Sequence, residues 1–569
     1  MSLVRVLFVA AVAAAAAAGT RPAVAQPKQP PATPWGVSSS ASAFRNHAEW
    51  LPRVAAVGVT SVRLFPEWRG VEPKTGTWRW HDADALVKSA AVNGVEITGI
   101  LMGSPPGAKA AHAFPMDDLD GWAGYVAGAV GRYKQIRYWE VWNEGNGGFN
   151  DGKHTTADYA KLAAVTYAAG KKANPDARIG LSVASFDAPY LDQAIRAMAK
   201  AGTPGRFDHL CVHPYELADG LAEPDGEVPY LWMTKLLRDL LKTSAPDKAD
   251  AEIWITEVGR RVEKTKHRTV TDAEAAAGLV KLYTMALAQG VARVQWFEAQ
   301  DPVGEGQGFG LIERGGKERP AYHALKGLTA ALGPAPRYIG WVAPGEAGRA
   351  YGFVFEGKAG PVLVAWLPKG VTDRTAVVTG APLTDTPVVA GALPPALVEQ
   401  ARANAGRPFP WGGNYAAARA VSLRLGAEEK SEGVALVGRH DRPVVRFADG
   451  TSGVLLEGDI GHPISFTVHP SFASIGTREY YVRATVRRVA PGNVGMNLLY
   501  EVADSQGHGP YANTGRWFGT TADAGWQTHT WRVTDACFSK MWGYDITLRP
   551  EQSIPFALGR VEVSTRPFE

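Results

Sequence analysis

The sequence predicts an α/β protein in which a (β/α)₈ barrel (TIM barrel) is followed by all-β domains. Between residues 35 and 332, eight short apolar runs alternate with Ala-rich stretches of helical periodicity, as in a barrel of parallel strands. After residue 333 the helical periodicity largely disappears and short alternating runs replace it, which is typical of antiparallel sheets. The length of 569 residues leaves room for two or three such domains.

The eight apolar runs each have the length of a strand, and most are too continuously apolar to belong to half-exposed strands. In chain order they are WGVSS (35–39), TSVRLF (60–65), VEITGIL (95–101), IRYWEVW (136–142), ARIGLSV (177–183), FDHLCVH (207–213), EIWITEV (252–258) and RVQWFEA (293–299). An open doubly wound sheet is the alternative fold. That fold usually carries a glycine-rich phosphate-binding turn after its first strand, and WGVSSSASAF has no such turn.

Helical stretches lie between these runs. Residues 82–94 carry apolar side chains at helical spacing and end in Asn-Gly, a typical helix stop. Residues 156–176 and 271–290 have the same character, and the second of them opens with Thr-Asp-Ala-Glu, close to a capping box. The alternation of strand and helix therefore favours the closed barrel.

The N-terminus resembles a secretory signal. Arg5 precedes an apolar stretch, and Ala-Val-Ala before Gln26 offers a small-residue cleavage site. We therefore predict a signal peptide over residues 1–25, a Pro-rich leader over 26–34, and a secreted or periplasmic protein. An uncleaved N-terminal anchor is the alternative, and no other segment predicts a membrane association.

Two β-domains are expected after the barrel: a small one over residues 333–424 and a β-sandwich of jelly-roll type over 425–569. The sandwich is a candidate carbohydrate-binding module, because such folds often act as lectins. A stabilising lid over the edge of the barrel is the alternative role. The candidate exposed aromatic side chains of this module are Tyr511, Trp517, Trp526, Trp531 and Trp542.

The composition excludes several classes of function. The formal net charge is +4 and no basic run carries interleaved aromatics, so we expect neither nucleic acid nor an anionic membrane as a partner. Cys211 and Cys537 are the two cysteines, too few for a disulfide framework or a zinc site, although a bridge between them is an open alternative. The histidines show no metal-binding spacing, and we predict no metal and no cofactor.

Catalytic residues of a (β/α)₈ barrel lie at the carboxyl ends of the strands. The side chains that the predicted strands present there include a pair of glutamates, from strands four and seven. The candidate site residues are Arg63, Asn143, Glu144, His213, Tyr215, Glu257 and Trp296.

Two carboxyl groups that face each other across a barrel mouth suit the hydrolysis of glycosides. One must be protonated and the other ionised, so their surroundings must separate their pKa values. Arg63 and Tyr215 are expected to hold Glu257 ionised, whereas partial desolvation beside Trp142 favours protonated Glu144. For a retaining enzyme the two groups should lie about 5 to 5.5 Å apart.

Several motifs resemble those of the clan of retaining (β/α)₈ glycoside hydrolases known as clan A, loosely its family 39. The motifs are WNE (142–144), ITEVG (255–259), VRLF (62–65) and the strand-eight Trp296. The resemblance covers roughly residues 35–330, and family 39 also carries a β-domain after the barrel. After strand three this sequence has GSPPGAKA, without the tryptophan of the clan, so the substrate pocket is expected to differ.

The resemblance implies a role for each matching residue. Glu144 takes the role of the acid/base and Glu257 that of the nucleophile, while Asn143 contacts the sugar 2-hydroxyl and Trp296 lies beneath the sugar. The sequence thus predicts a secreted retaining glycoside hydrolase that cleaves a polysaccharide or oligosaccharide by double displacement. A transglycosylase with the same site and a non-catalytic carbohydrate-binding protein are the alternatives. We expect the glycine-rich segment 304–310 to be a mobile loop at the rim of the cleft.

Overall fold

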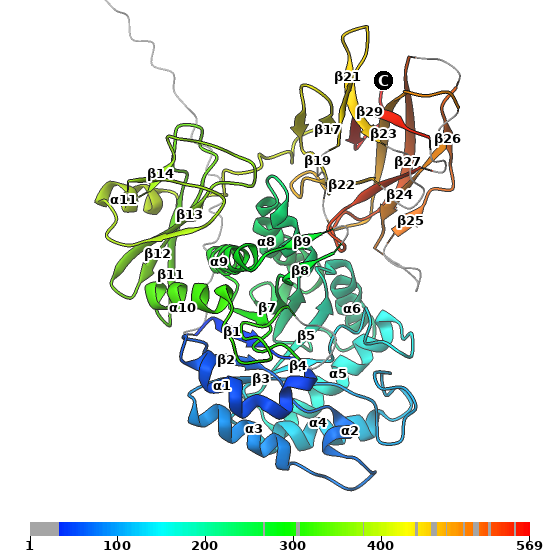
Figure 1. Cartoon of the computed structure of the whole chain (residues 1–569). Coiled ribbons are helices and arrows are strands. Elements are labelled where there is room, and N and C mark those ends of the chain that lie inside the picture. Colours follow the sequence, from blue (N-terminus) through cyan, green and yellow to red (C-terminus); the bar gives the residue numbers. More distant parts are fainter. Residues whose placement is uncertain are drawn as a thin grey trace, which may run out of the picture.

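The computed structural model describes residues 33–569, except 266–267, 303–307, 379, 439–441, 457–463, 474, 493–494, 504–510, 522–524 and 551–553 (Figure 1). The predicted signal peptide, almost all of the predicted leader and most of the glycine-rich segment 304–310 lie outside the described residues.

The first domain is a closed barrel of eight parallel strands, in the order β1-β10-β7-β6-β5-β4-β3-β2. The strands are β1 (Trp35–Ser38), β2 (Ser61–Arg63), β3 (Glu96–Leu101), β4 (Tyr138–Val141), β5 (Arg178–Ala184), β6 (His209–His213), β7 (Glu252–Val258) and β10 (Arg293–Phe297). Each lies within one of the eight apolar runs or overlaps it almost completely, so the barrel and its strands are confirmed. Side chains from these strands are mostly buried, as expected for a parallel sheet covered by helices.

Helices connect the strands and surround the barrel (Figure 1). They are α1 (His47–Ala55), α2 (Trp68–Val71), α3 (His81–Val92), α4 (Leu119–Arg132), α5 (Thr156–Ala173), α6 (Ala188–Lys200), α7 (Tyr215–Asp219), α8 (Glu227–Ser244), α9 (Asp272–Ala288) and α10 (Pro320–Leu332). Short 3₁₀ turns span Ala41–Asn46, Gly220–Ala222 and Pro246–Lys248, and a small hairpin joins β8 (Glu263–Lys264) to β9 (Thr269–Val270). The predicted capping box is present, because Thr271 and Glu274 accept hydrogen bonds from each other's backbone N–H groups at the start of α9.

The second domain is a four-stranded antiparallel sheet beside α9 and α10. Its strands are β11 (Arg337–Val342), β12 (Tyr351–Gly357), β13 (Gly360–Trp366) and β16 (Val388–Ala390), with a hairpin of β14 (Val377–Val378) and β15 (Ala381–Pro382) and the helix α11 (Pro395–Ala403). Aromatic side chains of the sheet join the hydrophobic core of the barrel. The buried carboxylate of Glu227 accepts hydrogen bonds from both Trp366 and Lys281, at 3.0 and 2.9 Å, which ties the sheet to α8 and α9.

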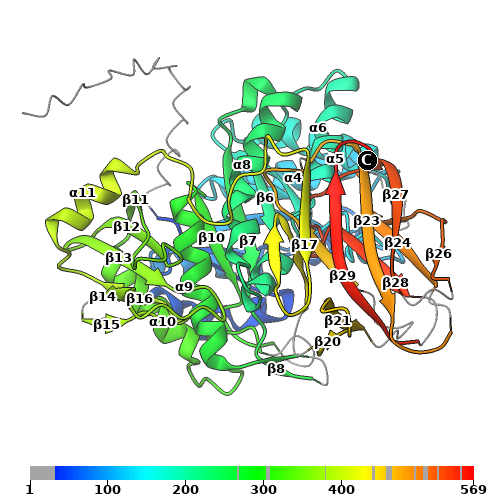
Figure 2. The same ribbon diagram turned by 90° about the horizontal axis from the view of Figure 1, so that it is seen from above.

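The third domain is a sandwich of two antiparallel sheets with its own hydrophobic core, on the opposite side of the barrel from the second domain (Figure 2). One sheet holds β17 (Ala420–Arg424), β18 (Lys430–Glu432), β20 (Val444–Arg446), β21 (Ser452–Leu456), β23 (Arg478–Arg488), β27 (Trp526–Ala536) and β29 (Phe556–Ser564). The other holds β19 (Val434–Leu436), β22 (Ile464–Val468), β24 (Gly495–Glu501), β25 (Tyr511–Asn513), β26 (Phe518–Gly519) and β28 (Ile546–Pro550). Because β17 pairs with β29, the sandwich begins one strand before the expected boundary at residue 425.

One expectation about the exposed aromatic side chains of this domain is wrong, and the open alternative of a cysteine bridge is excluded. Trp531 is buried in the sandwich core, because it lies on the inward face of β27, whereas Trp517 and Trp542 are 52% and 48% exposed. Cys211 in β6 and Cys537 in the sandwich are both free and buried, so no bridge joins them. Among the described residues, no helix has the length and apolar character needed to cross a membrane.

Candidate active site

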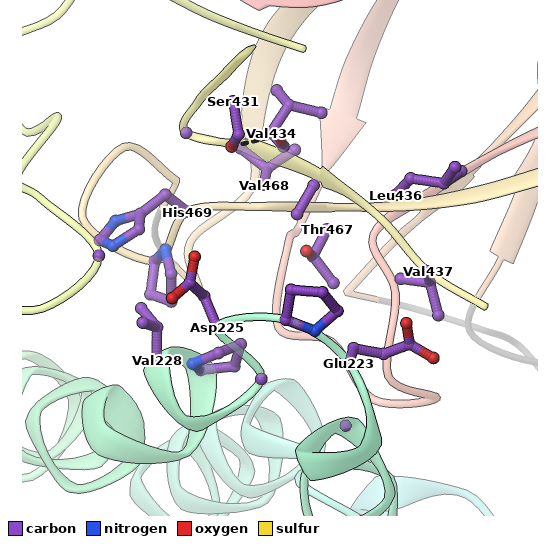
Figure 3. Close-up of a pocket in the computed structure, with 18 of the residues that line it drawn as sticks. Glu223, Asp225, Val228, Ser431, Val434, Leu436, Val437, Thr467, Val468 and His469 are labelled. Carbon is purple, nitrogen blue, oxygen red and sulfur yellow. Dashed lines mark hydrogen bonds between the residues drawn. The ribbon is translucent and has the colours of Figure 1, made fainter. Parts of the chain in front are cut away.

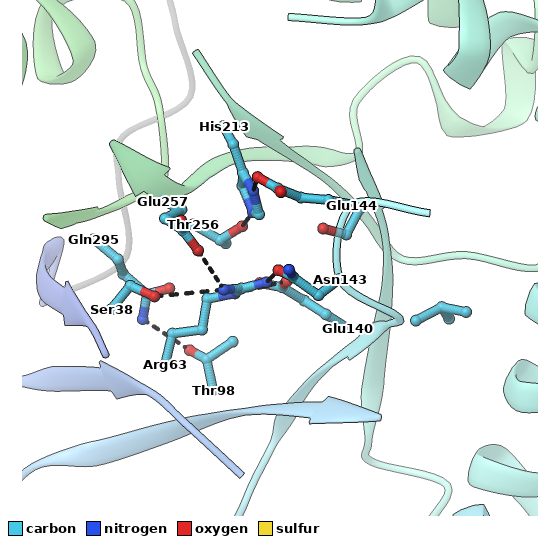
Figure 4. A network of polar contacts seen from close by, with 12 residues as sticks. Ser38, Arg63, Thr98, Glu140, Asn143, Glu144, His213, Thr256, Glu257 and Gln295 are labelled. Atoms are coloured by element: carbon cyan, nitrogen blue, oxygen red, sulfur yellow. Dashed lines mark hydrogen bonds and ion pairs between the residues drawn. The ribbon is translucent and has the colours of Figure 1, made fainter. Parts of the chain in front are cut away.

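The carboxyl ends of the barrel strands bring most of the predicted site residues into one polar network (Figure 4). The contacting side chains come from the ends of β2, β6 and β7, from the turn after β4 and from the start of α7. The six predicted residues that meet there are Arg63, Asn143, Glu144, His213, Tyr215 and Glu257. Trp296 does not join them.

Arg63 is the centre of the network. Its guanidinium donates to Glu140 Oε2 at 2.9 Å, to Glu257 Oε2 at 2.9 Å and to Asn143 Oδ1 at 2.7 Å. Glu140 was not predicted as part of the site. Glu140 is the one charged residue of β4, and a buried charge needs a partner. That lone charge was the signal in the sequence that could have identified it.

The Arg63–Glu140 pair leads to a prediction about stability. Both side chains are buried, so the Arg63→Met substitution leaves the Glu140 charge unpaired inside the barrel. We expect the free energy of unfolding to fall by about 3 to 5 kcal/mol, measured by chemical denaturation. Adding Glu140→Gln to Arg63→Met should restore a large part of that loss. A double variant no more stable than Arg63→Met would contradict the assignment.

Glu257 is held by two donors. Tyr215 donates its hydroxyl to Oε1 at 2.7 Å, and Arg63 donates to Oε2 at 2.9 Å. Burial raises the pKa of Glu257 above its ordinary value, and the Arg63 charge and the Tyr215 hydrogen bond both oppose that rise. Both oxygens of Glu257 thus accept hydrogen bonds, a geometry that favours its ionised form.

Glu144 has a neutral neighbour instead. Its Oε1 lies 2.8 Å from Nδ1 of His213, whose Nε2 lies 3.2 Å from the hydroxyl of Thr256. Burial lowers the pKa of His213 to about 4, so the imidazole is uncharged near neutral pH. Burial also raises the pKa of Glu144, and the Arg63 charge opposes that rise. The two glutamates therefore differ in surroundings, one beside a cation and the other beside a neutral ring.

The turn that carries Glu144 has an uncommon backbone. Trp142 and Glu144 have φ values of 65° and 48°, in the left-handed region that non-glycine residues rarely adopt. The buried indole of Trp142 donates to the carbonyl of Phe149 at 2.7 Å, which helps to hold the turn. Strain of this kind persists where surrounding structure enforces it and is common at functional sites.

The two carboxyl groups are close together and reachable from solvent. One oxygen of Glu144, one oxygen of Glu257 and one ring nitrogen of His213 all lie within 4.8 Å of one another. The side chains of Glu144 and Glu257 are 19% and 14% exposed. A metal ion is a poor fit among these three groups, because the guanidinium of Arg63 is already bound to Glu257 and both nitrogens of His213 have partners. The arrangement suits proton transfer and nucleophilic attack by the carboxyl groups.

The prediction that Trp296 lies in the site, beneath the sugar, is wrong. Side chains alternate along a strand, and Gln295 points into the barrel, where it donates to Thr98 at 3.2 Å. Trp296 therefore points outward and is 1% exposed. The next residue, Phe297, is partly exposed and lies near Tyr215, with ring centroids 6.4 Å apart. Phe297 and the neighbouring Phe309 form the aromatic wall on this side of the network.

Comparison with known proteins gives structural likenesses only. No protein-family model matches the chain, and no curated protein sequence matches it. A family 39 glycoside hydrolase from the gut symbiont Bacteroides cellulosilyticus WH2 is similar at 19% identity and a TM-score of 0.49, over 63% of this chain and 81% of that one. A monomeric β-xylosidase from Caulobacter crescentus CB15 has 16% identity and a TM-score of 0.46, over 95% of this chain and 98% of that one.

A family 39 enzyme from Xanthomonas axonopodis pv. citri is similar at 15% identity and a TM-score of 0.45, over 95% of this chain and 96% of that one. The solved structures that resemble this chain thus include members of the family that its motifs resemble. At these identities and TM-scores the likeness carries no conclusion about activity, so the function has to be inferred from the site itself.

Proposed function

We propose that this protein is a retaining glycoside hydrolase with Glu257 as the nucleophile and Glu144 as the acid/base. The observation that carries the proposal is the pair of carboxyl groups at the solvent-reachable end of the barrel, with oxygens within 4.8 Å of each other. An approach this close favours the spacing of retaining enzymes, about 5 to 5.5 Å, over the wider gap of about 6.5 to 9.5 Å that holds the water of an inverting mechanism.

In the first step an oxygen of Glu257 attacks the anomeric carbon of the bound sugar. The bond from that carbon to the leaving oxygen breaks, and Glu144 gives its proton to the leaving oxygen. Arg63 and Tyr215 orient the attacking carboxylate through their hydrogen bonds to its two oxygens. The product of this step is a glycosyl group covalently attached to Glu257.

In the second step Glu144, now ionised, removes a proton from a water molecule. The water oxygen attacks the anomeric carbon and displaces Glu257, so two inversions give net retention of configuration. His213 remains neutral throughout and serves Glu144 as a hydrogen-bond partner on Oε1. The other oxygen, Oε2, is then the one that exchanges protons with the leaving group and the water.

Asn143 is placed to bind the sugar. Because its Oδ1 accepts from Arg63 at 2.7 Å, the amide is oriented and its NH₂ group is the part left to donate to a substrate hydroxyl. This geometry supports a contact with the sugar ring whose bond is cleaved. We also propose that the mature protein acts outside the cytoplasm, and the support for this is the signal-like N-terminal sequence.

The decisive experiment is to determine the anomeric configuration of the first-formed product. A panel of 4-nitrophenyl xylosides, glucosides, galactosides and mannosides identifies an accepted substrate, and proton NMR follows its hydrolysis from the first minutes. We expect the product to have the configuration of the substrate. Release of the opposite anomer would overturn the retaining mechanism, and binding of glycans without any turnover would favour a non-catalytic protein.

The hydrogen bond from Tyr215 predicts a shift in pH dependence. The value of kcat/KM should fall as pH drops through the pKa of Glu257, which must be ionised, and as pH rises through that of Glu144, which must be protonated. Tyr215 donates to the ionised form of Glu257, so Tyr215→Phe should raise that pKa and move the acidic limb to higher pH. The alkaline limb serves as the internal control. An acidic limb that stays in place or moves to lower pH contradicts the role of Tyr215.

A further inference from the structure

The turn of residues 539–543 in the terminal sandwich is held by one buried carboxylate. Glu501, which is 1% exposed, accepts hydrogen bonds from the backbone N–H groups of Ser539, Lys540 and Met541, at 2.7, 2.8 and 3.1 Å. Three successive amides bound to a single side chain leave this turn little conformational freedom.

The same turn has two further features that cost free energy of folding. Lys540 has a φ of 62°, and its ammonium group forms a buried ion pair with Asp545 at 3.0 Å. Burying charges and holding a non-glycine residue in the left-handed region both cost free energy. Such a turn is preorganised, as expected where a side chain has to be presented in one position.

The side chain that this turn presents is Trp542. It is 48% exposed, and its ring centroid lies 5.2 Å from that of Tyr511. Tyr511 in turn stacks on Tyr544 at 4.7 Å and donates its hydroxyl to the carbonyl of Tyr544 at 2.6 Å. The indole is therefore braced by neighbouring aromatic rings and still offers nearly half of its surface.

The turn lies against the rim of the barrel beside the proposed active site. Gly543 packs on Glu216, since a Cβ on Gly543 would be 3.5 Å from the Cβ of Glu216. Glu216 directly follows Tyr215, which donates to the proposed nucleophile Glu257. The rim of the barrel and the turn that carries Trp542 are thus in direct contact.

A cavity of about 420 Å³ opens between the barrel and the sandwich at this contact (Figure 3). Its walls include Glu216 and Val228 from the barrel and Thr467, His469 and Lys540 from the sandwich. The cavity combines aliphatic and polar lining, and it lies next to the residue that follows Tyr215.

Sugar rings have apolar C–H faces that stack on indole rings and hydroxyl groups that need polar partners. We propose that Trp542 and the cavity lined by its chain neighbours Lys540 and Gly543 form a binding subsite for a sugar ring of the glycan beyond the ring whose bond is cleaved. This inference rests on the proposed function and assigns the terminal sandwich a part in the substrate cleft. An aromatic platform whose next residue, Gly543, contacts the residue that follows Tyr215 suits a substrate of several sugar units.

Paired tryptophan variants provide the test. Trp542→Ala removes the proposed platform, and Trp542→Phe keeps an aromatic face. Trp517→Ala is the matched control, since it removes a tryptophan of similar exposure from the same sandwich. Each is made in the full chain with Glu257→Ala, so that bound glycan is not turned over. Titration calorimetry then measures the affinity for xylopentaose, cellopentaose and mannopentaose.

For the pentasaccharide that binds best, we expect Trp542→Ala to weaken binding about tenfold, as for the loss of one aromatic contact. Trp542→Phe should retain most of the affinity and Trp517→Ala all of it. Equal affinities for Trp542→Ala and Trp517→Ala overturn the subsite, and so does the absence of binding to any of the three glycans. Binding that depends on Trp542 in a protein whose wild type hydrolyses no glycoside would sustain the subsite and refute the proposed function.

Discussion

Replacing Glu257 by alanine is expected to lower kcat on the order of 10⁴-fold or more, because the substitution removes the atom that bonds to the anomeric carbon. The rest of the network stays in place, since Arg63 keeps its bonds to Glu140 and Asn143. The measurement is the hydrolysis rate of an accepted 4-nitrophenyl glycoside by wild type and variant. Circular dichroism and thermal unfolding show whether the variant is folded.

Added azide gives this prediction a chemical control. In Glu257→Ala, azide can occupy the space of the missing carboxylate and attack the anomeric carbon of a 2,4-dinitrophenyl glycoside from that side. The expected product is a glycosyl azide of inverted configuration, because a single displacement replaces two. A variant that keeps activity within tenfold of the wild type would rule out Glu257 as the nucleophile.

Replacing Glu144 by alanine is expected to cause the second large loss of activity. The size of that loss should depend on the leaving group of the substrate. For natural glycosides, whose leaving alcohols need a proton, kcat/KM should fall by about 10²- to 10⁴-fold. For 2,4-dinitrophenyl glycosides the fall should be small, because that leaving group departs without proton donation. The measurement is kcat/KM for a series of aryl glycosides that differ in the pKa of the leaving group. The rate of the variant should depend on that pKa much more steeply than the rate of the wild type.

The same variant distinguishes the two glutamates. Azide should attack the glycosyl-enzyme from the side vacated by Glu144 and give a glycosyl azide of retained configuration, opposite to the product from Glu257→Ala. The alkaline limb of the pH profile, which belongs to Glu144, should also disappear. An equal loss of rate for good and poor leaving groups would show that Glu144 does not act as the proton donor.

Much of the fold could be predicted from local patterns. The eight barrel strands were recognisable because buried parallel strands are short apolar runs, and α9 because its capping box lies next to a helical period. The positions of Glu144 and Glu257 followed from the same patterns, since residues at the carboxyl ends of barrel strands share one rim. Arg63 and Tyr215 contact Glu257 as expected, whereas the contact of His213 with Glu144 was not predicted. The strands β4 and β6 are not neighbours in the barrel, so these two residues meet only because the ring is closed.

Other features depend on contacts between residues far apart in the sequence, which no short stretch of sequence reveals. Phe297 rather than Trp296 lies beside Tyr215. Which of the two side chains does so depends on which residues of β10 face the inside of the barrel. Glu140 becomes the partner of Arg63 only when β2 and β4 belong to one closed ring. The contact between Gly543 and Glu216 joins residues of different domains.

The sequence by itself therefore determined the strands, the helices and the pair of glutamates, because hydrophobic periodicity and residues at strand ends are local properties of the chain. Only the tertiary structure decided which aromatic side chains line the network, which buried charges are paired, and where the terminal sandwich touches the barrel. Those outcomes depend on packing between segments far apart in the sequence, where burial and hydrogen bonding are settled by the whole fold.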